Sequence, residues 1–316
     1  AKAMRYKDFG TTGLKVSAIG VGTWGVGGRG WGGSDREGSI QALRAMFDAG
    51  VNLVDTAPAY NRGLAEEITG EAIQGLRDKV IITTKCGMNI DKPGWAVKTA
   101  TWDEVIRGCE GSLMRMGLDY VDVLLLHWPD EKTPLQESIE AMAHLKKQGK
   151  VRFIGVSNLD AEKMEEVRKY ADVDVTQLPL SMVDRSADSS LRWAGAHGMA
   201  TMTYGSLGAG ILSGAIREHK EFDEDDVRGR FYSFFREPEF SKVMELLKSM
   251  DKIAEKRGVP VSQIATNWVV QKEYVHTALI GVRTVEHAND NCAALSWELT
   301  GDELAYLDAE IDRLLR

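Results

Sequence analysis

Eight short apolar segments, rich in Val, Ile and Leu, recur along the chain and alternate with longer segments of helical periodicity. These segments lack the polar alternation of a half-exposed strand, which is typical of strands buried on both faces of a parallel sheet. The pattern therefore predicts an α/β fold built around a parallel sheet. The predicted strands are Ala18–Val21, Asn52–Val54, Val80–Thr83, Val121–Leu126, Phe153–Val156, Val175–Leu178, Ala200–Thr203 and Ala278–Ile280.

Amphipathic segments follow the predicted strands, and several of them carry helix start signals. Residues Ser34–Glu37 and Thr101–Glu104 fit the S/T-x-x-E capping box, and Pro134 is expected at the first position of a helix. Eight strands that are each followed by a helix predict a (β/α)8 TIM barrel, here as a single domain spanning residues 1–316. The predicted helices cover residues 36–48, 65–76, 103–116, 135–148, 160–170, 188–197, 242–257, 262–272, 285–294 and 302–315.

Additional segments lie outside the strand–helix repeat. Met4–Phe9 and Lys15–Ser17 predict an N-terminal hairpin that covers the bottom of the barrel. Residues 302–315 predict an extra C-terminal helix. Leu207–Phe240 is long, polar and poor in regular signals, which in a compact domain is typical of a lid or a binding loop.

The charge balance excludes several classes of partner. With 39 basic and 47 acidic residues the net charge is −8, which argues against non-specific binding to nucleic acids or anionic membranes. No segment approaches 18 consecutive apolar residues, and the first residues do not form a secretory signal. Cys86, Cys109 and Cys292 are too widely spaced for a disulfide framework or a metal motif. We therefore expect a cytoplasmic protein with no bound metal.

Two glycine motifs, Gly20–Gly25 and Gly25–Gly30, match the G-x-G-x-x-G fingerprint of dinucleotide-binding Rossmann folds. That fingerprint requires its third glycine at the opening of a helix. Here the glycines continue to Gly33, and the next helix begins only near Arg36. A glycine-rich loop after a strand instead favours close approach of the backbone to a ligand.

Four residues with acid–base chemistry follow the second, third and fourth predicted strands. Asp55, Lys85 and His127 each stand at a strand end, and Tyr60 lies in the loop after Asp55. Because the C-terminal strand ends of a TIM barrel form its active site, we expect these four side chains to converge. Each alone has an ordinary explanation as an ion pair, a core histidine or a packed tyrosine. Their joint placement predicts a catalytic group.

The residue types of this group indicate proton transfer to a substrate oxygen. An Asp55–Lys85 ion pair would offset the cost of desolvating both charges. An ammonium beside Tyr60 would lower the pKa of its phenol from about 10, so that Tyr60 can donate a proton while His127 orients the oxygen. A barrel hydrolase would need carboxylate pairs or a histidine cluster at the strand ends, and only Asp55 and His127 qualify.

At these positions the sequence resembles the aldo-keto reductase superfamily, nearly from end to end. Asp55, Tyr60, Lys85 and His127 match the catalytic tetrad of that family, and Phe153–Asn158 matches its I-G-V-S-N segment. The resemblance implies an NADP(H)-dependent oxidoreductase that reduces aldehydes or ketones to alcohols by hydride transfer, with Tyr60 as general acid/base.

The loop Leu207–Phe240 resembles the cofactor-clasping loop of the bacterial and channel-subunit branches of the family. An NADP-binding regulatory or redox-sensing subunit with slow turnover is therefore the alternative to an enzyme. The run 226–231 within the loop is expected to fold over the dinucleotide. The sequence does not indicate the oligomeric state.

The resemblance further implies which residues bind the cofactor. The nicotinamide end would contact Gly22, Thr23 and Trp24. Its carboxamide would be held by Ser157, Asn158 and Gln177, and the face of its ring would lie against Tyr204. The pyrophosphate would contact Ser206, Leu207, Gly208, Gly210 and Leu212. The adenosine end would contact Arg283, His287, Asp290 and Asn291. Asp55 and Gly281 complete the set of expected cofactor-binding residues.

The same resemblance implies a substrate site for a small carbonyl compound or alcohol. The residues expected to line it are Trp24, Tyr60, Trp95, His127 and Trp128. Arg283 favours the extra phosphate of NADP, but the segment around it lacks the K-S pair of some NADPH-preferring members. NADP is therefore the expected cofactor, with NAD as the alternative.

Overall fold

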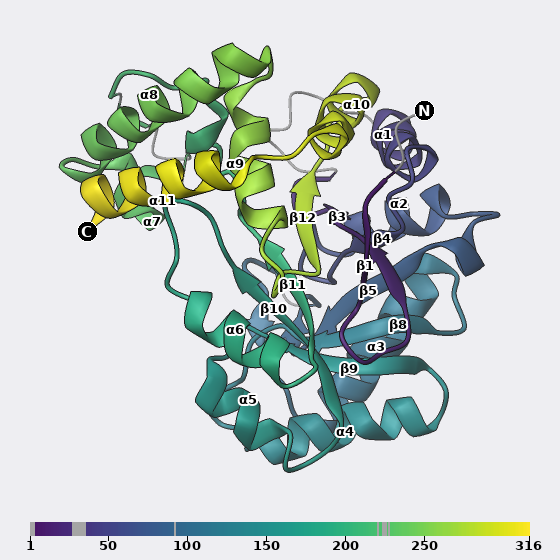
Figure 1. Cartoon of the computed structure of the whole chain (residues 1–316). Helices are drawn as coiled ribbons and strands as arrows, with labels where there is room; N and C mark the ends of the chain where they lie inside the picture. The colour runs from purple at the N-terminus through teal and green to yellow at the C-terminus, as the bar shows by residue number, and fades with distance from the viewer. Residues whose placement is uncertain (1–3, 27–35, 92, 220, 223–225, 227) are drawn as a thin grey trace.

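The computed structural model describes residues 4–26, 36–91, 93–219, 221–222, 226 and 228–316. Eight parallel strands close into a barrel in the order β10-β11-β12-β3-β4-β5-β8-β9 (Figure 1). The predicted (β/α)8 TIM barrel is thus confirmed. The barrel strands are β3 (Ile19–Gly22), β4 (Leu53–Asp55), β5 (Ile81–Cys86), β8 (Val121–Leu126), β9 (Val151–Ser157), β10 (Val173–Pro179), β11 (Ala200–Tyr204) and β12 (Thr277–Gly281).

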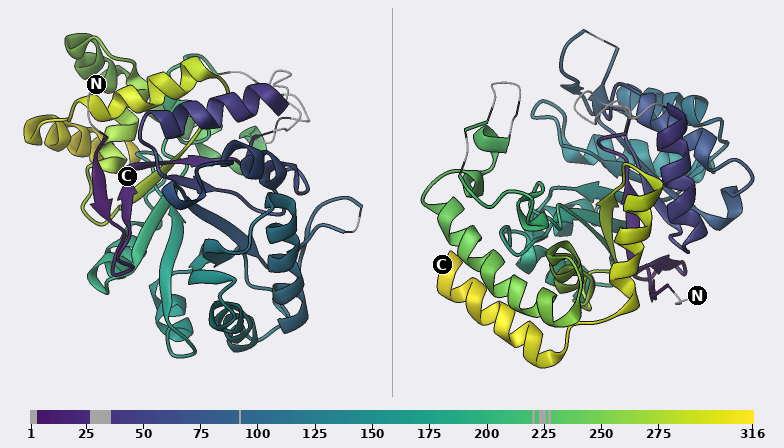
Figure 2. Two further views of the ribbon diagram at one scale, coloured as in Figure 1. Left: turned by 90° about the vertical axis from the view of Figure 1, so that its right-hand side faces the viewer. Right: turned by 90° about the horizontal axis from the view of Figure 1, so that it is seen from above.

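Each helix predicted from periodicity is present. The helices are α1 (Arg36–Asp48), α2 (Leu64–Ala72), α3 (Trp102–Met116), α4 (Leu135–Lys147), α5 (Ala161–Val167), α6 (Asp188–Ala196), α8 (Glu239–Arg257), α9 (Val261–Val270), α10 (Val285–Ala293) and α11 (Gly301–Leu315). Figure 2 shows the extra C-terminal helix α11 running alongside α8, against which it packs. Among the described residues, no helix has the length and apolar character needed to cross a membrane.

The helix starts agree only in part with the predicted capping signals. Thr101 caps α3, since its side chain accepts a hydrogen bond from the Glu104 amide. The expectation for Pro134 is wrong by one position, because Pro134 is the N-cap residue and α4 begins at Leu135. The expected cap at Ser34 lies outside the described residues. A capping box that we did not predict joins Thr300 and Glu303 at the start of α11.

The predicted N-terminal hairpin is present and closes one end of the barrel. Strands β1 (Tyr6–Asp8) and β2 (Lys15–Ser17) pair in antiparallel register. Phe9 and Val16 are fully buried and pack with the inward-facing side chains of the barrel strands. Those inward-facing residues are Leu53, Ile81, Val123, Leu125, Val175, Ala200, Met202 and Leu279. The interior of the barrel is therefore a packed core that leaves only the opposite end open for chemistry.

Two loops contain short elements that periodicity did not predict. A second hairpin, β6 (Met88–Asn89) and β7 (Val97–Lys98), follows β5. The predicted binding loop contains the 3-10 turns η2 (Ile211–Ser213) and η3 (Ser233–Phe235) and the short helix α7 (Arg228–Phe231). Its C-terminal boundary is also earlier than predicted, because α8 begins at Glu239. Further 3-10 turns are η1 (Arg77–Lys79) and η4 (Ala294–Ser296).

Two glycines are required by close packing inside the barrel. A Cβ on Gly155, in β9, would lie 2.3 Å from the Val175 carbonyl oxygen of the neighbouring strand. A Cβ on Gly20 would lie 2.8 Å from the Leu53 side chain. Gly20 therefore serves packing between strands, which explains part of the G-x-G-x-x-G match without a Rossmann fold.

We predict that Gly155→Ala destabilises the protein by about 1–3 kcal/mol, because backbone atoms of β10 cannot move away from the added methyl group. Urea unfolding followed by circular dichroism measures the change. The control is Gly108→Ala in α3, where a Cβ meets nothing within 4 Å. That substitution is expected to stabilise the protein by up to about 1 kcal/mol. Equal effects of the two substitutions would contradict the packing argument.

Candidate active site

The polar residues predicted from the strand ends gather at the open end of the barrel. Asp55 ends β4, Lys85 lies in β5, and His127 follows β8 directly. Gln177 lies near the C-terminal end of β10, and Tyr204 is the last residue of β11. Since all barrel strands are parallel, their C-terminal ends meet at one rim, as expected for a TIM barrel.

A buried ion pair lies at the centre of this rim. The Lys85 Nζ atom donates to both carboxylate oxygens of Asp55, at 2.9 and 2.8 Å, and to the Thr56 carbonyl oxygen at 3.0 Å. Gln177 Nε2 donates to the same carboxylate at 2.9 Å. Both side chains of the pair are almost fully buried. The ion pair expected between the two strand ends is therefore present, and the three donors of the ammonium all have partners.

The ammonium of Lys85 keeps its charge. Burial alone lowers the pKa of Lys85, but the negative charge of Asp55 and hydrogen bonds to Asp55 and Tyr60 raise it above its usual value. A carboxylate at contact distance in a medium of low polarity outweighs the desolvation of the ammonium. Lys85 is therefore a fixed cation next to Tyr60.

Tyr60 lies over this cation, in the loop between β4 and α2. The Lys85 Nζ atom is 4.7 Å from the centre of the Tyr60 ring. Burial raises the pKa of Tyr60, Lys85 lowers it and Asp55 raises it, so that the net shift is upward. The expectation of a lowered pKa is therefore wrong in net direction, because desolvation of the phenolate exceeds the attraction of the ammonium.

His127 faces Tyr60 as an uncharged ring. The two rings meet edge to face, with centroids 5.8 Å apart and planes at 87°. Burial, followed by the positive charges of Lys85 and Lys98, lowers the pKa of His127 to about 3. Its Nδ1 atom is buried and has no hydrogen-bond partner among the described residues. A neutral imidazole of this kind can donate an N–H to a substrate oxygen without transferring a proton.

A second polar group adjoins the first across the rim. Asn158 accepts a hydrogen bond from the Tyr204 hydroxyl at 2.5 Å and donates one to Ser157 at 3.0 Å. The Asn158 backbone is left-handed, with a φ of 61°. Non-glycine residues in this conformation are uncommon and concentrate at functional sites. Ser157, Asn158 and Tyr204 therefore form one connected unit beside Gln177.

The turn that follows β11 offers unpaired polar atoms and open backbone. Gly205, Gly208 and Gly210 all have positive φ, and a Cβ on Gly205 or Gly210 would meet nothing within 4 Å. The Ser206 hydroxyl is buried and has no partner within the described part of the chain. Leu212 is fully buried and anchors the turn, whereas Leu207 is half-buried. An orphaned hydroxyl beside accessible glycine backbone suits a phosphate-bearing ligand.

The residues after β12 form the exposed edge of the same rim. Thr284 caps α10 by accepting from the His287 amide at 3.0 Å, and Asn291 donates to the Gly281 carbonyl oxygen at 2.9 Å. Arg283 lies just before the first turn of α10, and its backbone amide donates to His287 Nδ1 at 3.3 Å. Asp290 is exposed.

The aromatic residues expected around a substrate differ in their placement. Thr23 is buried and donates to the Asp55 carbonyl oxygen, but the adjacent Trp24 is 72% exposed. Trp95 lies between β6 and β7 and is 90% exposed, so in this structure it packs against little. Trp128 is half-buried, and the Lys98 Nζ atom lies 4.8 Å from the centre of its ring. The Trp128 ring is also nearly parallel to that of the preceding His127, with the two centroids 6.3 Å apart.

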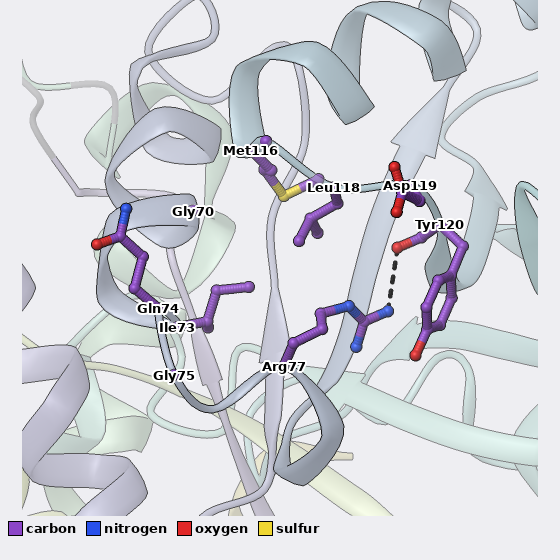
Figure 3. A pocket seen from close by; sticks show the side chains of 10 residues that line it. Gly70, Ile73, Gln74, Gly75, Arg77, Met116, Leu118, Asp119 and Tyr120 are labelled. Carbon is purple, nitrogen blue, oxygen red and sulfur yellow. Dashed lines mark hydrogen bonds between the residues drawn. The ribbon is translucent and has the colours of Figure 1, made fainter.

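A cavity of about 340 Å³ lies at the other end of the barrel, away from these residues (Figure 3). Residues at the ends of α2 and α3 line it, among them Ile73, Met116 and Tyr120. The Arg77 guanidinium at its edge already donates to the Tyr120 and Val80 carbonyl oxygens and pairs with Asp122. The one guanidinium that lines the cavity among the described residues is therefore already paired within the protein.

Comparison with known proteins places this arrangement in a family. The sequence model of the aldo/keto reductase family matches residues 18–312 of this chain. The chain belongs to the aldo/keto reductase family. An aldo-keto reductase of Bacillus subtilis is 36% identical, over 95% of this chain and 91% of its own length. An NADH-specific methylglyoxal reductase of Escherichia coli is 30% identical, over 94% of this chain and 95% of its own length.

Solved structures of aldo/keto reductases share the fold over nearly the whole chain. A glycerol dehydrogenase from Gluconobacter oxydans superposes with a TM-score of 0.88 and 31% identity, covering 99% of this chain and 96% of its own. An aldo/keto reductase from Klebsiella pneumoniae in complex with NADP and acetate gives a TM-score of 0.74 and 32% identity, covering 97% and 95%. The predicted family and the NAD(P)H-dependent class of oxidoreductase are confirmed. One of these relatives is NADH-specific and another binds NADP, which agrees with the expectation of NADP as cofactor and NAD as the alternative.

Two residues near the predicted catalytic group of this aldo/keto reductase were not predicted from the sequence. Lys98, in the unpredicted hairpin, lies over Trp128 and lowers the pKa of His127. Glu66, in α2, is fully buried beside the strand that carries Lys85. The sequence held a signal for Glu66 alone, because it falls on the buried face of α2 together with Ala65 and Ile68.

We predict that Asp55→Asn destabilises the protein by about 3–5 kcal/mol, because it leaves the Lys85 ammonium buried without a carboxylate. Adding Lys85→Met should recover much of this loss, since the double variant contains no unpaired buried charge. Urea unfolding of the single and double variants measures both effects. A double variant no more stable than Asp55→Asn would show that the pair does not dominate the stability of the rim.

Proposed function

We propose that this chain reduces aldehydes or ketones to alcohols with NADPH, and that Tyr60 is the general acid that protonates the carbonyl oxygen. The observation that carries the proposal is the placement of Tyr60 between a fixed cation, Lys85, and a neutral imidazole, His127. In the reverse direction Tyr60 would act as the general base that removes the proton from an alcohol.

The rim residues support binding of a nicotinamide dinucleotide. The Ser157, Asn158 and Gln177 side chains would hold its carboxamide, and the Tyr204 ring would lie against its flat face. The glycine-rich turn from Ser206 to Leu212, which includes Gly208, would hold the pyrophosphate. Gly22, Thr23 and Trp24 would border the nicotinamide end, and Gly281, Arg283, His287, Asp290 and Asn291 the adenosine end. When bound, the reduced nicotinamide supplies the hydride.

The proton side of the reaction follows from the electrostatics of the rim. The raised pKa of Tyr60 keeps its phenol protonated at neutral pH and ready to donate. Once the proton has left, the phenolate lies against the Lys85 ammonium, which Asp55 holds in place. His127 would direct an N–H at the carbonyl oxygen and so align it with the Tyr60 hydroxyl. Trp24, Trp95 and Trp128 would border the substrate.

We predict that Tyr60→Phe removes nearly all turnover of aldehydes, a loss of about 100-fold or more, because the general acid is gone. The affinity for NADPH, measured by fluorescence titration, should change less than twofold. Tyr120→Phe removes the same hydroxyl at the far end of the barrel and serves as the matched control. Undiminished turnover of Tyr60→Phe would rule out the proposed acid. Slow single turnover by the unmodified protein would favour the regulatory alternative.

We further predict that Arg283→Ala raises the KM for NADPH about tenfold, because a charge-assisted hydrogen bond to the extra phosphate is lost. The KM for NADH should change little, since NADH lacks that phosphate. Steady-state assays with both cofactors and one aldehyde measure the two values. An equal rise for NADPH and NADH would show that Arg283 does not read the phosphate.

A further inference from the structure

The most deeply buried carboxylate outside the rim belongs to Glu66, which is 0% exposed in α2. One of its oxygens accepts a hydrogen bond from the Thr84 hydroxyl at 2.8 Å, and the other accepts from Arg115 Nε at 2.8 Å. A buried carboxylate is costly unless it is paired and hydrogen-bonded, and here both oxygens have partners. Glu66 thus joins α2, β5 and α3 at one point outside the barrel.

The residues joined at this point are close in sequence to two members of the proposed catalytic group, Lys85 and Tyr60. Thr84 immediately precedes Lys85, and because strand side chains alternate, Thr84 points toward the helices while Lys85 points into the barrel. On the other side, α2 begins at Leu64, four residues after Tyr60. The hydrogen bond between Glu66 and Thr84 therefore ties the segment carrying Tyr60 to the strand carrying Lys85.

Arg115 reinforces the start of α2 from α3. A Cβ on Gly63, the N-cap residue of α2, would lie only 2.7 Å from Arg115 Cδ. Gly63 has a φ of 89°, which closes the Tyr60 loop and opens the helix. Two further hydrogen bonds join the loop to β5, from the Thr56 amide to the Thr83 carbonyl oxygen at 2.9 Å and from Lys85 Nζ to the Thr56 carbonyl oxygen at 3.0 Å, and both lie before Tyr60. Glu66 supplies the tie after it.

We propose that Glu66 is a positioning residue, which acts through Thr84 to hold the Tyr60 loop at a fixed distance from Lys85. The inference rests on the proposed role of Tyr60 as general acid. Without the tie, α2 and the loop before it can move relative to β5, and the contact between the Tyr60 ring and the Lys85 ammonium loosens. Misplacement of an acid by a fraction of an ångström is enough to slow catalysis.

Thr84→Val tests the proposal with the charge pair of Glu66 and Arg115 left intact. Valine keeps the β-branched shape but lacks the hydroxyl that donates to Glu66. We expect kcat to fall about tenfold, while KM for the aldehyde and the affinity for NADPH change less than twofold. The matched control is Thr203→Val in β11, because Thr203 is equally buried and its hydroxyl has no partner among the described residues.

The pH profile of kcat separates positioning from a general loss of stability. The titratable groups that face Tyr60 are Lys85, Asp55, His127 and Tyr204. Because Lys85 lowers the pKa of Tyr60, a loosened contact moves the alkaline limb of the Thr84→Val profile to higher pH. A purely structural role would lower the amount of folded enzyme and leave the limb in place. Unchanged kcat and pH profile in Thr84→Val, or equal losses in Thr203→Val, would overturn the proposal.

Two substitutions of Glu66 complete the test. Glu66→Gln retains an oxygen for Arg115 and an amide group for the Thr84 hydroxyl, so we expect kcat within about twofold of the unmodified enzyme. Glu66→Met retains neither bond and should reproduce the kinetics of Thr84→Val. Loss of kcat in Glu66→Gln as large as in Glu66→Met would contradict the proposal. If Tyr60→Phe keeps full activity, the proposed acid fails instead, whatever these variants show.

Discussion

The buried ion pair between Asp55 and Lys85 is the interaction on which the site depends. Its two charges come from neighbouring strands and are removed from water, so each is tolerable only because the other is present. Gln177 from the far side of the barrel shares the carboxylate, which extends the network across the rim. The pair therefore both joins the strands and sets a fixed positive charge beneath Tyr60.

The electrostatics of the rim assign distinct protonation states to adjacent groups. Tyr60 remains a phenol because burial raises its pKa, and His127 remains a neutral imidazole because burial and nearby ammonium groups lower its pKa. The ammonium of Lys85 opposes the rise in the pKa of Tyr60 without reversing it. An acid that holds its proton at neutral pH, beside a cation that stabilises its anion, is suited to donate only when a substrate oxygen accepts.

The architecture was predictable from sequence because strand burial and helix periodicity leave strong patterns. The strand ends then located Asp55, Lys85 and His127, and the structure brings them together with Tyr60. The sequence could not give the net pKa direction of Tyr60, since that depends on how closely surrounding atoms exclude water. It also could not give Lys98, whose hairpin has strands of only two residues, or the partners of Glu66, which lie on other elements.

The central claim is that the Lys85 ammonium lowers the pKa of Tyr60 against the larger effect of burial, and one titration tests it most directly. Tyrosine labelled with carbon-13 at Cζ gives an NMR signal that shifts on ionisation, and the Tyr60 signal is assigned by its absence from Tyr60→Phe. The account predicts a higher titration midpoint for Tyr60 in Lys85→Met than in the unmodified protein. The same midpoint in both proteins, or a lower one in Lys85→Met, would contradict it.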